Sequence, residues 1–260
     1  MTHPQLLRRR DHLGHLKLFT AQERLEALLQ DASAQEVTYA DFLDRLLTEE
    51  ITAKGEKAVA MRTAMARFPF RKPLESFDDG FQPAVDRKKL QELATGRFRE
   101  YGEHIVCRGP PGTGNTHLAI GLGLKAIQQG HRTLFTSALS LIATLTKASA
   151  DHRIEERLTL YTVPKLLIID EMGDIPIDRH GAHLFFQLIS RRYERGASIL
   201  TANQSCGQWA EVFGDPIVAT AILDRLLHHS HVINIQGDSY RLKEKQKAGL
   251  LKKVPVPDAV

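Results

Sequence analysis

Cysteines and metal-binding clusters are scarce in this chain of 260 residues. The two cysteines, Cys107 and Cys206, lie far apart, so neither a disulfide framework nor a C-x-x-C metal site is expected. Three histidines, His228, His229 and His231, stand close together, but no matching cysteine or acidic cluster lies beside them, and we do not expect a metal there. The expected environment is therefore a reducing one.

Long hydrophobic runs are also missing. No segment approaches the ~20 apolar residues that a membrane-spanning helix needs. The N-terminus carries arginines but lacks the continuous apolar stretch of a secretory signal. We therefore expect a soluble, cytoplasmic protein with no membrane partner.

Neither sign of charge is in large excess. The chain has 35 Lys and Arg against 31 Asp and Glu, a net charge of +4 and a pI near 9.1. This mildly basic balance permits nucleic-acid binding without demonstrating it. Hydrophobic residues make up 42% of the chain, which is enough for a core, and the length suits one α/β domain with a smaller appendage.

The most informative absence is a single lysine. Residues 109–116 read GPPGTGNT, follow an apolar run and open a helical pattern, which is the setting of a phosphate-binding loop. The motif G-x-x-x-x-G-K-[ST] places a lysine where this chain has Asn115. That lysine normally reaches the β- and γ-phosphates, whereas asparagine is neutral and shorter. The pattern predicts weakened nucleotide binding and impaired hydrolysis, while Thr116 keeps the hydroxyl that ligates Mg²⁺.

Two acids end a later apolar run, LLIIDE at residues 166–171. A buried parallel strand would deliver Asp170 and Glu171 to the edge of the sheet where ligands bind. Asp170 would then hold Mg²⁺ through water, and Glu171 would orient or deprotonate the attacking water. A strand that ends in two acids by chance is disfavoured by the glycine-rich loop upstream. Asn203 ends the next apolar strand and is either a phosphate-sensing side chain or an ordinary turn residue.

Arginines supply the remaining candidate for the chemistry. Arg225 lies on a helix with an apolar pattern, where it either stabilises transition-state charge from a neighbouring subunit or pairs with a nearby acid. Arg191 and Arg192 compete for the same role, but we expect both to lie on the surface of a helix.

Periodicity separates a helical N-terminal part from an alternating C-terminal part. Residues 4–65 show helical spacing of leucines, with a break at 31–35 and a capping pattern from Thr38 to Asp41. From residue 101, near-continuous apolar strands alternate with helices, which predicts a parallel sheet covered on both faces. The expected strands are 105–107, 133–136, 166–171, 198–203 and 232–235.

The order of these motifs resembles the AAA+ ATPases of the initiator and helicase-loader clade. Several flanking segments resemble more specifically the IstB family, the ATP-binding helpers of insertion-sequence transposases. The resemblance covers nearly the whole chain. Its flanking segments are 38–43, 49–50, 68–69, 77–78, 170–173, 192–194, 223–230 and 238–241.

The resemblance implies an α/β fold: a P-loop AAA+ domain with a parallel sheet flanked by helices, preceded by a small all-helical domain. It implies the Walker B acids Asp170 and Glu171, sensor 1 at Asn203 and an arginine finger at Arg225. ATP and Mg²⁺ are the implied cofactors; Thr116 and Asp170 are the candidate Mg²⁺ residues. The candidate ATP-binding residues are Gly109, Pro110, Pro111, Gly112, Thr113, Gly114, Asn115, Thr116, His117 and Asp170.

The expected domains are a helical N-terminal domain (1–66), a linker (67–84), the AAA+ nucleotide-binding domain (85–242) and a basic tail (243–260). The family role implies duplex DNA bound with little sequence preference, a homo-oligomer and a partner transposase. Candidate DNA contacts are the arginines at 8–10, the pair Arg71 and Lys72, and the tail.

Three alternatives stay open. The first is a DnaC-like helicase loader, which differs in its partner. The second is a DNA-binding adaptor that works without nucleotide, because Asn115 has ended hydrolysis. The third, a small-molecule P-loop kinase, is disfavoured by adjacent Asp170 and Glu171 and by the separate helical domain. Since Lys and Asn codons differ by one base, natural decay, deliberate mutation and a sequencing error are all compatible with Asn115.

Overall fold

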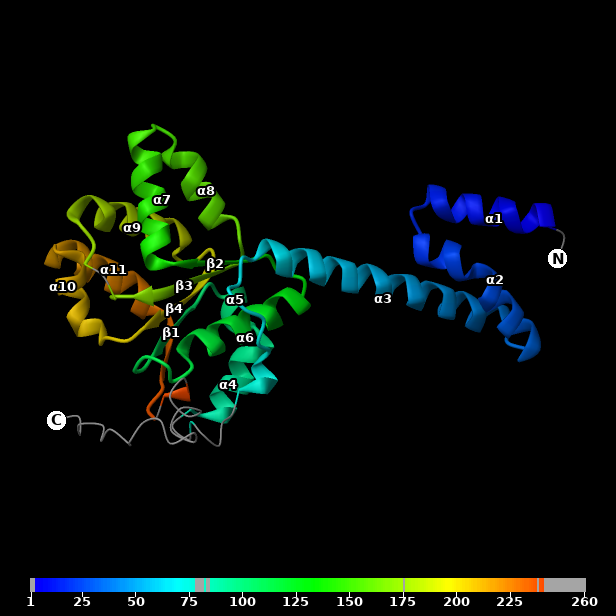
Figure 1. Cartoon of the computed structure of the whole chain (residues 1–260), viewed down its shortest axis with the longest axis horizontal. Helices are drawn as coiled ribbons and strands as arrows, with labels where there is room; N and C mark the ends of the chain where they lie inside the picture. The colour runs from blue at the N-terminus through cyan, green and yellow to red at the C-terminus, as the bar shows by residue number, and fades with distance from the viewer. Residues whose placement is uncertain (1–2, 78–81, 83–84, 175, 238, 241–260) are drawn as a thin grey trace, which may run out of the picture. The chain divides into compact units, whose positions relative to one another are not determined.

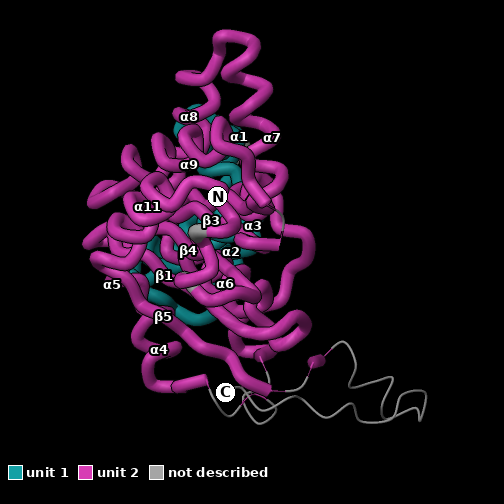
Figure 2. The backbone as a smooth tube through the Cα atoms, turned by 90° about the vertical axis from the view of Figure 1, so that its left-hand side faces the viewer, with its two compact units in different colours: residues 1–61 teal, residues 62–260 magenta. Residues whose placement is uncertain are grey.

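The computed structural model describes the chain except residues 1–2, 78–81, 83–84, 175, 238 and 241–260. It divides into two compact units, Met1–Met61 and Arg62–Val260 (Figure 2). The expected basic tail and the residues Phe81, Asp238 and Arg241 lie outside the described part. Among the described helices, none combines the length and the apolarity needed to cross a bilayer.

The first unit is helical, as predicted. It contains α1 (His3–His15), α2 (Phe19–Ala34) and most of α3 (Tyr39–Met65). Leu25 and Leu28 of α2 pack with Leu46 of α3 in a small core. The buried carboxylate of Glu50 accepts a hydrogen bond of 2.9 Å from the backbone N–H of Ala21, which ties the start of α2 to α3. The break at 16–18, between α1 and α2, was not predicted.

The second unit is built on a parallel sheet with the strand order β2-β3-β4-β1-β5 (Figure 1). Each predicted strand is present, and no end differs from its predicted position by more than two residues. The order places β4 between β1 and β3, so the strand that ends before Asn203 separates the loop strand from the acid strand. The strands are β1 (His104–Arg108), β2 (Thr133–Ser137), β3 (Leu166–Met172), β4 (Ala197–Ala202) and β5 (Ser230–Asn234).

Both faces of the sheet are buried, which explains its near-continuous apolar strands. Because side chains alternate along a strand, Leu167 and Ile169 of β3 pack into one cluster with α7–α11, while Leu166 and Ile168 pack into another with α4 and α6. Figure 1 shows the two helix layers on opposite faces. The helices are α4 (Arg87–Thr95), α5 (Arg97–Glu100), α6 (Asn115–Gln128), α7 (Ala138–Ala150), α8 (Ile154–Thr162), α9 (Arg179–Arg192), α10 (Trp209–Phe213) and α11 (Pro216–His228).

Two helices, α9 and α11, each begin at an aspartate N-cap. Asp178 accepts from the backbone N–H of Gly181 at the start of α9. Asp215 accepts from two backbone N–H groups of α11, whose first residue is Pro216. Helix α4 ends at the C-cap Gly96, whose φ of 87° is left-handed.

The expectation that Arg192 lies on a helix surface is wrong. Its side chain is 1% exposed, because it shares a helix face with the buried Leu188 and Ile189. The guanidinium donates to Ser198 Oγ at 3.0 Å, to the carbonyls of Tyr161 and Pro164 at 2.8 and 3.0 Å, and to that of Ala197. Burial lowers the Arg192 pKa to about 10.

Its neighbour Arg191 does lie at the surface, as expected. It forms a bidentate pair with the carboxylate of Glu155 at 2.7 Å.

Candidate functional site

The glycine-rich loop joins β1 to α6 and turns through two left-handed glycines. Gly112 has a φ of 86° and Gly114 a φ of 111°, conformations that other residues rarely adopt. A Cβ on Gly114 would also lie 2.7 Å from the ring of Phe77. Thr113 is buried and donates to the Pro110 carbonyl at 2.8 Å, which closes the turn. The loop therefore leads directly into the N-terminus of α6, where backbone N–H groups favour anions.

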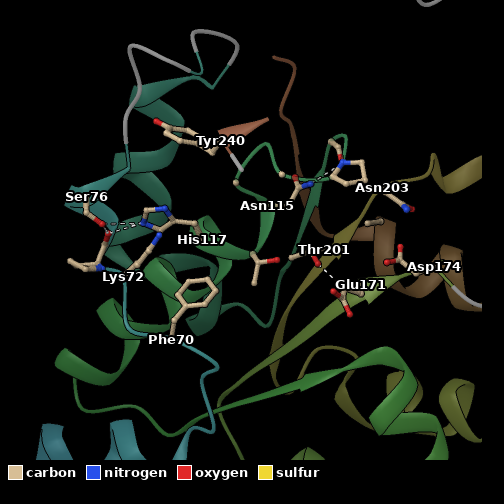
Figure 3. Close-up of a pocket in the computed structure, with 17 residues that line it drawn as sticks. Phe70, Lys72, Ser76, Asn115, His117, Glu171, Asp174, Thr201, Asn203 and Tyr240 are labelled. Atoms are coloured by element: carbon tan, nitrogen blue, oxygen red, sulfur yellow. Dashed lines mark hydrogen bonds between the residues drawn. The ribbon is translucent and has the colours of Figure 1, made fainter. Parts of the chain in front are cut away.

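Asn115 occupies the lysine position of the motif and folds back onto the loop. Its Nδ2 donates to the Gly109 carbonyl at 2.8 Å. Its Oδ1 is buried and has no hydrogen-bond partner among the described residues. The amide therefore helps to close the loop and adds no cation to the cavity (Figure 3).

The structure brings the loop and the acid strand together. Thr116 Oγ1 donates to Asp170 Oδ1 at 2.9 Å, although the two residues are 54 positions apart in the sequence. Asp170 is 6% exposed and also accepts from the hydroxyl of Thr201. A hydroxyl and a carboxylate converging at the tip of a glycine-rich loop are oxygen donors of the kind Mg²⁺ prefers. The chemistry of Thr116 and Asp170 therefore fits this ion.

A β-bulge displaces Glu171 from the regular strand. The β3–β4 ladder shifts its register between Ile169 and Met172, and Glu171 has a φ of 60°. The backbone N–H of Glu171 donates to Thr201 Oγ1 at 2.9 Å, so Thr201 contacts both acids of the pair. Glu171 lines a cavity of about 680 Å³ above the loop, together with Asn203 just beyond β4.

Sequence reasoning missed two residues on this side of the cavity. Thr201 lies within an apolar run, and its position beside Asp170 follows from the strand order, which the sequence does not state. Asp174 lies beyond the acid pair and lines the same cavity. Loss of hydration raises the pKa of Asp174, and the nearby charge of Asp170 adds to the effect.

The opposite wall comes from the segment that was expected to be a linker. Residues 70–76 run along α6, where His117 Nε2 lies 3.1 Å from the Pro73 carbonyl and 3.2 Å from Ser76 Oγ. The Phe77 ring contacts His117 edge-on, with 5.4 Å between the ring centroids, and packs in the core cluster with α4 and α6. Burial lowers the pKa of His117. This wall is formed by Phe70, Lys72, Pro73, Ser76, His117 and Tyr240 (Figure 3).

Arg225 is not brought to this cavity. Its guanidinium lies over the Phe186 ring at 4.6 Å and donates to the Ala221 carbonyl at 3.1 Å.

The histidines near the end of α11, which the sequence analysis considered as metal ligands, contact other side chains. His231 pairs with Glu103 at 2.9 Å, and His228 meets the hydroxyl of Tyr193 at 2.8 Å.

Comparison with known proteins places this site in a family. The family of IstB-like ATP binding proteins matches residues 11–248, which include the loop, the acid strand and most of the N-terminal helices. The chain belongs to this family. It is 47% identical over 245 residues to the ATP-binding protein of insertion sequence IS21 from Pseudomonas aeruginosa, a match that covers 94% of this chain and 92% of the relative.

A second relative shows the same likeness. The ATP-binding protein of insertion sequence IS5376 from Geobacillus stearothermophilus is 42% identical over 236 residues, covering 91% of this IstB-like chain and 94% of the relative. Among solved structures, the DnaC helicase loader resembles the fold with a TM-score of 0.50 at 21% identity, over 57% of this chain and 87% of that one. The likeness confirms the predicted fold class of this IstB-like protein, an α/β domain with a parallel sheet flanked by helices.

Proposed function

We propose that this IstB-like protein binds ATP with Mg²⁺ in the cavity above β1 and β3 and acts as the ATP-binding helper of an insertion sequence. The observation that carries the proposal is the 2.9 Å contact between Thr116 and Asp170 at the mouth of the glycine-rich loop. The relatives named for ATP binding and for insertion sequences support it.

The residues that would bind ATP and activate water have the following proposed roles. Backbone N–H groups at 112–116 and the N-terminus of α6 bind the phosphates. Thr116 would hold Mg²⁺ directly and Asp170 would hold it through water, and the ion would supply charge that neutralises the phosphates. Glu171 takes the proton of the attacking water, and Asn203 orients that water from the end of β4.

Asn115 limits the reaction more than it limits binding. An asparagine side chain is neutral, so Asn115 contributes no charge to the β- and γ-phosphates, and its Nδ2 is already hydrogen-bonded to the Gly109 carbonyl. We expect an ATP affinity reduced by roughly 1–3 kcal/mol, the scale of one charge-assisted contact. Turnover by the isolated chain should be near background.

Arg225 is proposed to act in trans. It lies on α11, is partly exposed and does not line the cavity of its own chain. An arginine that completes a neighbouring site would make hydrolysis depend on assembly into a homo-oligomer.

Duplex DNA is the proposed partner, contacted mainly through its phosphates. A second cavity of about 570 Å³, at the edge formed by β2, supports this part of the proposal. Four arginines line it: Arg62, Arg67, Arg132 and Arg157. Contacts of this kind read little sequence, and their affinity should fall steeply as salt rises. Stimulation of a partner transposase completes the proposed role.

The decisive experiment compares this chain with Asn115→Lys. ATP binding and phosphate release are measured for both proteins, with and without duplex DNA, at two salt concentrations. We expect tighter binding and DNA-stimulated turnover in Asn115→Lys, and weak binding with background turnover in the chain itself. Absence of ATP binding by both proteins would refute the proposed nucleotide site. Recovery of a replicative helicase in place of a transposase in a pull-down would favour the helicase-loader alternative.

A further inference from the structure

The cavity lacks its usual lysine but not a positive charge. Among the described residues that line it, Lys72 is the lone lysine or arginine. It lies on the wall built from residues 70–76, across from the acids Glu171 and Asp174 (Figure 3). A phosphate chain bound along the loop would therefore lie between this ammonium and the acidic side that Mg²⁺ neutralises.

The backbone around Lys72 is held against the loop helix. The next residue, Pro73, has a fixed φ, and its carbonyl lies 3.1 Å from His117 Nε2. Ser76 Oγ meets the same nitrogen at 3.2 Å. His117 follows Thr116 in the first turn of α6, so these contacts place the stem of Lys72 beside the phosphate-binding turn.

Among the residues that the structure describes, no carboxylate forms an ion pair with the ammonium of Lys72. Its Nζ lies 5.7 Å from the centroid of the Phe70 ring. The neighbouring acid of the segment, Glu75, pairs instead with Lys125 of α6. Figure 3 shows the Lys72 side chain extending toward His117. Burial is the main cause of the lowered pKa of His117, and the charge of Lys72 lowers it further.

We infer that Lys72 supplies the cation that contacts the nucleotide's phosphates in this site, in place of a lysine at position 115. The inference rests on the proposed ATP site. A lysine is suited to the role because its flexible four-carbon stem carries a compact charge that can reach a phosphate from a neighbouring segment. Lys72 would thus keep a positive charge on the cavity wall, although the Asn115 side chain is neutral and hydrogen-bonded to Gly109.

The test is a double-mutant cycle on the full-length chain. The four proteins are the chain itself, Lys72→Met, Asn115→Lys and the double variant. Dissociation constants for ATP and AMP are measured with Mg²⁺ and without DNA. We expect Lys72→Met to weaken ATP binding roughly tenfold in the unchanged chain, the scale of one charge-assisted contact. In the Asn115→Lys background the loss should shrink to about threefold or less, and AMP affinity should change little in either background.

Lys147→Met is the matched control, because Lys147 is exposed on α7 and does not line the cavity. The thermal transition of each variant verifies its fold. The inference is overturned if Lys72→Met behaves like Lys147→Met, or if it weakens ATP equally in both backgrounds. If Lys72→Met weakens duplex-DNA binding but not ATP binding, its cation serves DNA phosphates and the inference is wrong. Failure of Asn115→Lys to bind ATP would instead refute the proposed function on which the inference stands.

Discussion

Thr201 holds the two acids of the site in place with one hydroxyl group. Its Oγ1 donates to the buried carboxylate of Asp170 and accepts the backbone N–H of Glu171 at 2.9 Å. Without the hydroxyl, a buried carboxylate would lose a donor and a strained backbone would lose its restraint. Thr201 is therefore a positioning residue, since it acts through Asp170 and Glu171.

Thr201→Val, made in the Asn115→Lys protein so that turnover can be measured, tests this role. We expect the rate of ATP hydrolysis to fall roughly tenfold, because one charge-assisted hydrogen bond is lost. Thr201→Ser keeps the hydroxyl and should retain most of the activity. Equal rates for the valine and serine variants would show that the hydroxyl has no such role.

His104 links protein stability to pH. It is 1% exposed, and its Nδ1 accepts the backbone N–H of Ser198 at 3.2 Å. Burial, followed by the charges of Arg192 and His229, lowers the His104 pKa from 6.5 to about 4. The folded protein therefore holds this imidazole neutral. As pH falls from 6.5 toward 4, the unfolded chain takes up the proton first, and stability is lost across that window.

His104→Asn removes the titration but keeps an acceptor for Ser198. Between about pH 7 and pH 4.5 the unfolding free energy of the chain should fall by about 2 kcal/mol more than that of the variant. Urea titrations at the two pH values measure the difference. An identical fall in both proteins would assign the acid sensitivity to other groups.

At the scale of elements, Arg192 joins the end of α9 to β4 and to the turn after α8. Its donors satisfy carbonyls that would otherwise be buried without partners. Arg192→Met keeps a long apolar stem but removes every one of these bonds. We expect it to lower the unfolding free energy by roughly 3–5 kcal/mol, as expected when a buried charged network is broken.

The control is Arg191→Met, one residue away. Arg191 pairs with the exposed Glu155, so its loss should lower the unfolding free energy far less than the loss of Arg192. Denaturant unfolding of the two variants compares a buried with an exposed arginine on the same helix. Similar values for both would contradict the role assigned to Arg192.

At the scale of the whole molecule, the two units carry separate cores. The first is small and depends on Ala21, Leu25, Leu28 and Leu46, while the second has a cluster on each face of its sheet. A small core supports little independent stability. Every residue of the nucleotide cavity belongs to the second unit.

We therefore expect a fragment of residues 62–260 to fold and to bind ATP with the affinity of the full chain. Circular dichroism and nucleotide titration of the fragment test this. In the full chain, denaturant should unfold the first unit before the second, which would appear as two transitions. An unfolded fragment, or a single transition reported by probes in both units, would show that the units depend on each other.

The sequence alone was sufficient where the signal is local. Strands that are buried on both faces have unbroken apolar runs in the sequence, as at 105–107 and 166–169. The glycine-rich loop and its missing lysine are also local, because every residue of the motif lies on one turn. The family resemblance followed from these motifs and their flanking segments. The proposed domain boundaries and the chemical roles of the site residues remain predictions.

Tertiary structure decided what depends on neighbours far apart in the chain. The strand order places Thr201 between the loop and the acids, and no spacing in the sequence states that order. The sequence-based prediction put Arg192 at the surface, because a charged residue at a helix end is normally solvated. In the structure it is surrounded by carbonyls from residues far away in the sequence. The segment carrying Lys72 was expected to be a linker, because two prolines mark a break but do not say what the chain then packs against. Its place on the cavity wall depends on contacts with α6, which exist only once the sheet has folded.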